Sequence, residues 1–368
     1  MRSSYLACVL LSAVCWHWTA LAGSPVPIQC RGCGLSPAEL GNLSMYMHTL
    51  MSKALESVDC EIRGSMSKVG DRCLICFFAR DAELDALVAA TRMEVHCRDD
   101  NLISGTEQAA ASLSKSLQAR PPSLPRLSVQ PIESRGSGLD ADALSGLTDY
   151  WMAGVIESGK VWVVDPGKEK GSKRRAGRAK AAKPAEHTLR VIITKVGDNC
   201  LLSFLASNAE RDTLVAALGE KSTCASDYLI DRIDRAAIAL GRSLQARSAS
   251  APRVVVQPIE SRGSGLDADA LSGLTDYLIA HLVASGAVFV ANPVQRRRSK
   301  SRPAVEHTIR VTVARVGPRC ILTSAVFDQR GNMVKGTSQR AKCDPDGLIY
   351  AAEKTARDLA RVLGAAGP

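Results

Sequence analysis

The sequence has few aromatic residues and none of the common catalytic motifs. Phe, Trp and Tyr make up 4% of its 368 residues. It contains no Gly-x-Ser-x-Gly, His-Glu-x-x-His or P-loop sequence, which mark many hydrolases, zinc peptidases and nucleotide-binding enzymes. Beyond its N-terminal region it has no apolar run of about 20 residues, the length that a membrane-spanning helix needs. We therefore expect no catalytic residues and no cofactor, and predict that the protein is not an enzyme.

The N-terminal segment is typical of a secretory signal. Arg2 supplies positive charge, residues 6–14 form a short apolar run, and Ala20-Leu21-Ala22 is a small-x-small cleavage site. We expect residues 1–22 to direct the chain to the periplasm or out of the cell. The alternative is an uncleaved anchor. Either destination permits disulfide bonds.

The formal net charge of +10 is concentrated in two segments. Residues 168–183 hold eight basic residues and one Glu, giving +7, and residues 296–302 hold five basic residues, giving +5, so the rest of the chain carries about −2. We expect two protruding loops that attract anionic lipid, lipopolysaccharide or acidic polysaccharide, and no specific nucleic acid. The alternative is a pair of solvated loops without a partner. The predicted anion-binding residues are Lys173, Arg174, Arg175, Arg178, Arg296, Arg297, Arg298, Lys300 and Arg302.

Long internal repeats divide the chain. Residues 129–150 and 256–277 are identical, and residues 27–46 align with the same string without a gap. We therefore predict three units, at 24–125, 126–252 and 253–368, of which the first is divergent. A period above 100 residues indicates tandem domains rather than a solenoid.

Each unit is predicted to have an α/β (α+β) fold, a sandwich-like unit with the order β-α-β-β-β-β-α. In the third unit, residues 253–259 are apolar and β-branched, which favours a strand, and residues 266–282 have helical spacing. Residues 288–290 and 308–316 are the next strands, and residues 348–363 repeat apolar side chains every three or four positions, as a helix packed on the sheet does. A strand–helix–strand order favours a parallel crossover.

Six cysteines are placed symmetrically about predicted hairpin turns. In the third unit the midpoint between Cys320 and Cys343 falls at Gly331-Asn332, which is turn chemistry. Residues equidistant from a hairpin turn face each other across the two strands, close to the separation that a disulfide needs. We predict the disulfides Cys73–Cys97, Cys200–Cys224 and Cys320–Cys343, each stabilising the fold by about 3 kcal/mol.

The first unit contains four more cysteines in the mature chain, Cys30, Cys33, Cys60 and Cys76. The spacing of Cys30 and Cys33, and of Cys73 and Cys76, is C-x-x-C, which occurs in zinc sites. In an oxidising compartment two extra disulfides are the favoured interpretation. A third alternative is thiol-redox chemistry at Cys30 and Cys33, which precede a predicted helix.

The Gly263-Ser264-Gly265 loop fits the pattern G-x-G-x-x-A between a strand and a helix. In dinucleotide sites such glycines let a pyrophosphate approach the helix N-terminus. Here Asp267 and Asp269 place negative charge where a phosphate would bind. We therefore favour a flexible loop with capping aspartates, and a nucleotide site is the alternative.

Residues 254–293 resemble the opening of envelope α/β modules, namely the TolB amino-terminal domain, CsgG-like secretion proteins and LpoB-type activators of penicillin-binding proteins. The matching positions are Leu274, Thr275, Asp276, Leu278, Ser285, Gly286 and Val290. Gln257-Pro258-Ile259 departs from the common Leu-Pro-Phe of these modules. The resemblance implies a non-catalytic interaction module of the cell envelope.

The sequence as a whole predicts an exported, non-catalytic scaffold or interaction protein of the envelope with a protein partner. The alternative is a thiol-redox or nucleotide-binding enzyme that uses Cys30 and Cys33 or the Gly-Ser-Gly loop.

Overall fold

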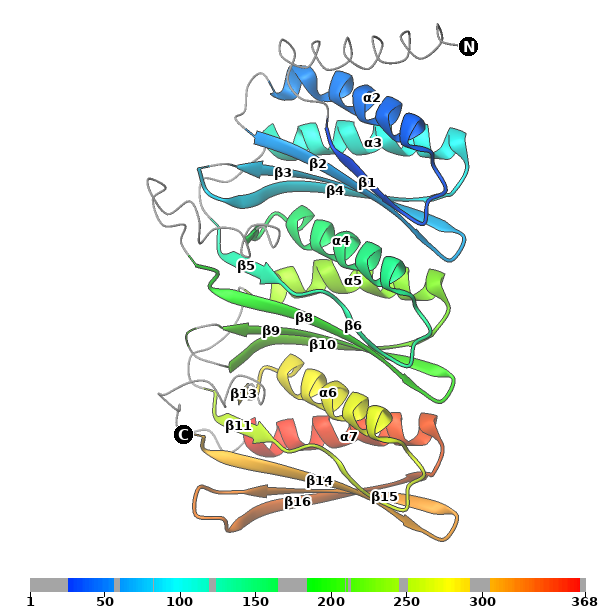
Figure 1. The fold of residues 1–368 in the computed structure, drawn as a ribbon. Helices are drawn as coiled ribbons and strands as arrows, with labels where there is room; N and C mark the ends of the chain where they lie inside the picture. The colour runs from blue at the N-terminus through cyan, green and yellow to red at the C-terminus, as the bar shows by residue number, and fades with distance from the viewer. Residues whose placement is uncertain are drawn as a thin grey trace, which may run out of the picture.

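Figure 1 shows the fold in a computed structural model of the chain. The structure describes residues 26–364 except 56–59, 82, 119–123, 165–183, 209, 211–212, 245–250 and 292–304. The predicted signal and both predicted basic loops, with all nine of their anion-binding residues, therefore lie outside the described residues. Within the described ranges no helix is long and apolar enough to cross a membrane.

Along the described chain, single helices separate runs of one to four strands. The first unit contains β1 (Ile28–Arg31), α2 (Pro37–Leu55), β2 (Cys60–Val69), β3 (Arg72–Asp81), β4 (Ala86–His96) and α3 (Asp99–Gln118). The second contains β5 (Arg126–Val129), β6 (Glu133–Arg135), α4 (Ala141–Glu157), β7 (Trp162–Val164), β8 (His187–Val196), β9 (Asn199–Asn208), β10 (Thr213–Thr223) and α5 (Ser226–Ser243). The third contains β11 (Arg253–Val256), β12 (Glu260–Arg262), α6 (Ala268–Ala284), β13 (Phe289–Ala291), β14 (His307–Val316), β15 (Arg319–Phe327), β16 (Met333–Lys342) and α7 (Pro345–Gly364). The predicted α/β fold class is confirmed.

The strand predicted over residues 253–259 is shorter than expected. It ends at Val256, and a separate strand, β12, begins at Glu260. Pro258 lies between them, and proline has no backbone N–H to donate to a neighbouring strand. Both short strands pair with β14 in parallel. β11 also pairs in parallel with β13, the strand that follows α6 in the sequence, as the strand–helix–strand order predicts.

All the described strands belong to one mixed, 16-stranded sheet, in which β6 and β12 lie off the main path. Its main order is β1-β2-β3-β4-β7-β5-β8-β9-β10-β13-β11-β14-β15-β16. Two short antiparallel pairings carry the sheet across the predicted unit boundaries, with Ala86 opposite Val164 and Thr213 opposite Ala291. Hydrogen bonding therefore runs continuously from one unit to the next. The division of the chain into three domains stays a prediction.

Helices and strands alternate in layers (Figure 1). One face of β2–β4 contacts α3, and the other face contacts α4. In the same way β10 contacts α5 and α6, and β15 and β16 contact α7. The central core joins Leu74 and Phe78 of the first unit to Trp151 of α4 and Phe204 of β9, whose rings lie 4.9 Å apart. Helix α4 is therefore buried between two layers of strands.

The structure forms the three predicted hairpins and pairs the same cysteines that the sequence pairs. The Cα atoms of Cys73–Cys97, Cys200–Cys224 and Cys320–Cys343 are 5.0, 5.0 and 4.9 Å apart. The symmetry of the hairpins predicted that the two cysteines of each pair face each other directly. In the structure they do not. Cys73 lies opposite Val95, Cys200 opposite Ser222 and Cys320 opposite Ala341, so each second cysteine lies two residues further on. In each hairpin the turn lies nearer to the first cysteine than to the second, and the register shift between the turn and the cysteines only partly offsets this.

Candidate docking surface

Two helices of this protein bind to the strands of the preceding unit through the same small set of residues. At the first contact Arg31 of β1 lies beside Ser67 of β2 and donates to Asp149 of α4, at 2.6 Å. A Cβ atom added at Gly146, one turn before Asp149, would lie 2.3 Å from Ser67 Cβ. The helix therefore rests directly on the strand at its glycine, with the ion pair beside it.

The second contact repeats these features. Arg135 of β6 lies beside Thr194 of β8 and donates to Asp276 of α6, at 2.8 Å. A Cβ atom added at Gly273 would lie 2.5 Å from Thr194 Cβ. Burial raises the pKa of Asp276, whereas the Arg135 guanidinium acts in the opposite direction. We use the term arginine site for such an arginine together with its small neighbour on the adjacent strand. The helix segment bound at an arginine site is called a Gly-x-x-Asp helix.

A third arginine site exists but is unoccupied by any described residue. Arg262 of β12 lies beside Ala314 of β14 in the register of the other two sites. Arg262 is exposed, and no acidic partner for it is found within the described ranges. The chain thus presents at its C-terminal unit the same chemistry that binds α4 and α6 earlier in the sequence.

The sheet around this third site has one uncovered face. Helix α7 contacts β15 and β16 from one side, and in Figure 1 no described helix lies on the other side of β14–β16, the last layer of the stack. Ile192, Leu201, Leu205 and Leu214 are buried on the matching face of β8–β10. On β14–β16 the aligned residues are Thr312, Ile321, Ala325 and Met333, and Met333 is 66% exposed.

The open face is basic and partly apolar. The strand register places four basic residues on this face, Arg310, Arg319, Arg340 and Lys342, and β14–β16 contain no Asp or Glu. Arg310 lies over the ring of Phe327, with the guanidinium carbon 4.7 Å from the ring centre. Val316 is 58% exposed. A partner with acidic and apolar groups would complement this surface. We call this side of β14–β16, together with Arg262, the open sheet face.

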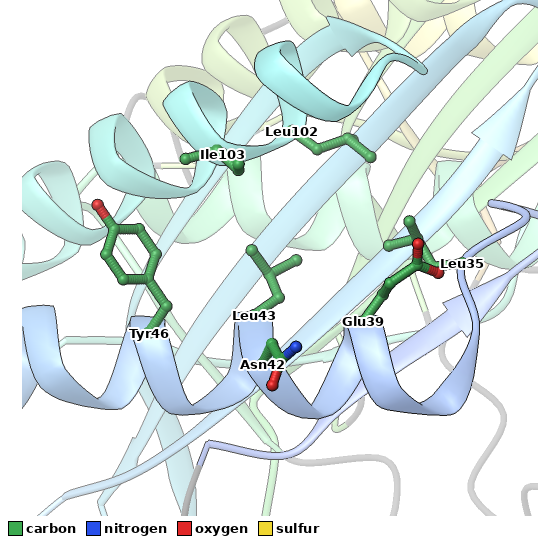
Figure 2. A pocket seen from close by; sticks show the side chains of 7 residues that line it. All are labelled: Leu35, Glu39, Asn42, Leu43, Tyr46, Leu102 and Ile103. Atoms are coloured by element: carbon green, nitrogen blue, oxygen red, sulfur yellow. The ribbon is translucent and has the colours of Figure 1, made fainter.

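The opposite end of the molecule has a shallow groove between α2 and α3 (Figure 2). It has a volume of about 420 Å³. Its lining residues are Leu35, Glu39, Asn42, Leu43, Tyr46, Leu102 and Ile103. Tyr46 donates to Glu107 at its edge. These α2 residues align with the face of α4 that contacts the first unit, although Asn42 aligns with Gly146 and Met45 with Asp149.

The Gly-Ser-Gly loop is closed on itself in the structure. Ser264 is buried, and its hydroxyl lies 2.5 Å from that of Ser261. Gly263 and Gly265 have φ of +70° and +81°, which favour glycine. Asp267 accepts the backbone N–H of Ala270 at 2.7 Å, as an N-cap does. The serine hydroxyls of the loop and the Asp267 carboxylate therefore form hydrogen bonds within the loop and the first turn of the helix. This supports the capping interpretation over a nucleotide site.

Cys30 and Cys33 form a disulfide, with Cα atoms 5.9 Å apart. They align with Ser134 and Ser137, whose hydroxyls are hydrogen-bonded to each other, and with Ser261 and Ser264. The disulfide thus replaces a hydroxyl pair that closes the same loop in the other two units.

The expectation of two extra disulfides is met only in part. Cys76 is a buried thiol in β3, and burial raises its pKa well above the usual value. Cys60 is half-buried at the start of β2. In the described part of the chain no group of three or more His, Cys, Asp or Glu side chains is placed to hold a metal ion, so the zinc alternative gains no support there.

The sequence reasoning missed the open sheet face and the three arginine sites. The signal for them was present, because Gly-x-x-Asp and the preceding Arg-Gly-Ser-Gly both lie within the identical 22-residue strings. The sequence did not show which arginine pairs with which helix, because each Gly-x-x-Asp helix binds the arginine of the preceding unit and not the arginine of its own unit.

No protein-family model matches the sequence, and no curated protein matches it significantly. Among solved structures, the PelC dodecamer from Paraburkholderia phytofirmans is 14% identical, with a TM-score of 0.23 over 34% of this chain and 90% of that one. Lipoprotein GNA1162 from Neisseria meningitidis is also 14% identical, with a TM-score of 0.21 over 30% and 96%. TolB from Acinetobacter baumannii is 12% identical, with a TM-score of 0.19 over 59% and 39%. These resemblances, including the one to TolB, are at the level of the fold only.

Proposed function

We propose that this protein is an exported, non-catalytic docking protein of the cell envelope that binds a partner protein through the open sheet face. One observation carries the proposal. The aligned faces of β2–β4 and β8–β10 are covered by α4 and α6, whereas no described helix covers that of β14–β16, which keeps its arginine site. A basic surface with exposed apolar residues fits an acidic, partly apolar partner surface.

The cysteines support export. Eight of them form four disulfides among the described residues. Stable disulfides are rare in reducing compartments, so their presence is compatible with the secretory signal expected at residues 1–22. In this proposal the protein acts in the periplasm or outside the cell.

The polybasic segments at 168–183 and 296–302 give the protein a second kind of attachment in this proposal. Lys and Arg in high local density attract anionic lipid, lipopolysaccharide or acidic polysaccharide, and the attraction weakens with added salt. The docking protein would then hold its protein partner close to an anionic surface. Vesicle binding at low and high salt by chains with and without these two segments tests this part separately.

Affinity capture from an envelope extract tests the docking proposal. The bait is the full exported chain, compared with a Val316→Glu, Met333→Glu variant that adds negative charge to the open sheet face. Tyr350→Glu is the matched control, because Tyr350 is an equally exposed apolar residue (61%) on α7. A partner identified by mass spectrometry should be retained by wild type and control and lost by the face variant. Equal retention by all three baits would contradict the proposal.

A further inference from the structure

The two occupied arginine sites define what a ligand of such a site looks like. Each binds an α-helix in which a glycine lies against the small residue beside the arginine, and an aspartate three residues later accepts from the guanidinium. Glycine is needed because the helix backbone lies so close to the strand that any Cβ atom there would clash with the small residue beside the arginine. Aspartate is needed because the arginine is partly withdrawn from water and requires an acidic partner.

We propose that the third arginine site, Arg262 with Ala314, binds a Gly-x-x-Asp helix of a partner chain. This rests on the proposed docking function and specifies the chemistry of the partner. Ala314 occupies the position of Ser67 and Thr194 in the parallel register. It is the smallest of the three, so a helix can approach it at least as closely.

A second feature extends the recognition beyond one helix. Lys221 of β10 forms an ion pair with Asp346, in the first turn of α7. Arg340 of β16 aligns with Lys221 and lies on the open sheet face opposite Ile321. The partner therefore carries an acidic residue at the start of a further helix packed beside the Gly-x-x-Asp helix, as α7 packs beside α6.

The α2 helix of a second copy lacks the required chemistry. Asn42 aligns with Gly146 and Gly273, and Met45 aligns with Asp149 and Asp276. A second copy would bring a side chain to the point of closest approach and a thioether to the guanidinium. Helix α2 is the element of a second copy that could cover the open sheet face, and it differs from a Gly-x-x-Asp helix at both the glycine and the aspartate position. The third arginine site therefore fits a different chain.

A helical peptide probes the site without knowledge of the natural partner. The probe is a fluorescent, lactam-bridged peptide of residues 267–284, which carries Gly273 and Asp276. Its matched control carries Asp276→Arg. Fluorescence anisotropy measures binding to the full exported chain, to Arg262→Glu and to Lys354→Glu, which makes the same charge change at an exposed residue of α7.

The probe should bind wild type and Lys354→Glu alike. Its affinity should fall about tenfold or more on Arg262→Glu, and the Asp276→Arg peptide should lose affinity for wild type by a similar factor. Binding that depends on neither Arg262 nor Asp276 would overturn the proposal. If the face variants still abolish capture from extract in that case, the docking function stands and only this partner class fails.

Sedimentation velocity of the full chain decides between a foreign partner and a second copy. Asn42→Gly with Met45→Asp converts α2 into a Gly-x-x-Asp helix, and circular dichroism checks that both variants fold. Wild type should stay dissociated, the double variant should associate, and adding Arg262→Glu should reverse the association. Arg262-dependent association of the wild-type chain would assign the site to a second copy and overturn the proposal.

Discussion

Gly273 on α6 lies against Thr194 on β8 so closely that a Cβ atom at Gly273 would be 2.5 Å from Thr194 Cβ. Non-bonded carbon atoms prefer about 3.5–4.0 Å. Gly146 and Ser67 have the same relationship at the preceding contact. At both places a helix rests on strands of the preceding unit with no side chain between them, so these two glycines set the spacing of the layers.

Replacing Gly273 by alanine should therefore destabilise the fold, although alanine is the better helix former. We expect Gly273→Ala to lower the free energy of unfolding by about 1–3 kcal/mol, as overpacking does. Gly41→Ala is the control, since Gly41 is also within a helix but has nothing within 4 Å of an added Cβ. It should raise stability by about 0.5–1 kcal/mol. Urea denaturation measures both, and a stabilising effect of Gly273→Ala would show that the spacing is not set by this contact.

Arg92 of β4 anchors the first unit to the second. Its side chain is 6% exposed and forms ion pairs with Glu157 of α4 and Asp234 of α5, at 3.1 and 2.6 Å. Removing one partner of a buried pair leaves charges without compensation. Arg92→Ala should lower the free energy of unfolding by about 3–5 kcal/mol.

The control for Arg92 is Arg357→Ala. Arg357 is 66% exposed and pairs with Glu353 at 3.7 Å on the surface of α7. Exposed pairs contribute about 0–1 kcal/mol. Guanidinium denaturation should separate the two variants clearly, and similar losses would show that Arg92 is not the anchor.

The two kinds of disulfide should differ in their contribution to stability. Cys200→Ser with Cys224→Ser opens a long loop and should cost about 3 kcal/mol. Cys30→Ser with Cys33→Ser should cost less, about 2 kcal/mol at most, because the hydroxyl pair found at Ser134 and Ser137 can form in its place. Thermal unfolding with intact-mass control of the remaining bonds measures both. A larger loss at Cys30 and Cys33 would assign that bond a role beyond closing its loop.

Stability should fall in mild acid through His281. Burial lowers the pKa of His281 from 6.5, with Arg357 acting in the same direction and Glu353 in the opposite one. Because the folded state binds the proton less readily than the unfolded state, the stabilisation is complete above pH 6.5 and is lost as pH falls through the lower, folded pKa. Urea denaturation at pH 8 and at successive values below 6.5 should show this loss. The slope should become shallower in His281→Gln, and an unchanged slope would exclude His281 as its source.

Local patterns were sufficient for most of the elements. The β-branched run before Pro258 predicted a strand, and the apolar spacing of residues 348–363 predicted the helix observed as α7. The cysteine spacing predicted three hairpin disulfides, because spacing from a turn is a local property of the chain. The same reasoning could not place the cysteines relative to the strands, since the turn of each hairpin lies nearer to the first cysteine than the spacing of the pair implies.

The sequence by itself determined the α/β class, the hairpins, the three hairpin disulfides and an aspartate cap at the start of the helix after the Gly-Ser-Gly loop, because each follows from neighbours along the chain. Only the tertiary structure decided that α4 and α6 bind the strands of the preceding unit, and that Arg262 is the one arginine of the three whose acidic partner is not among the described residues. The identical strings contain both halves of each contact, the arginine and the Gly-x-x-Asp segment, and sequence identity cannot say which copy binds which. That choice is made by the stacking of layers, which covers the faces of β2–β4 and β8–β10 with a helix, whereas no described helix covers the matching face of β14–β16.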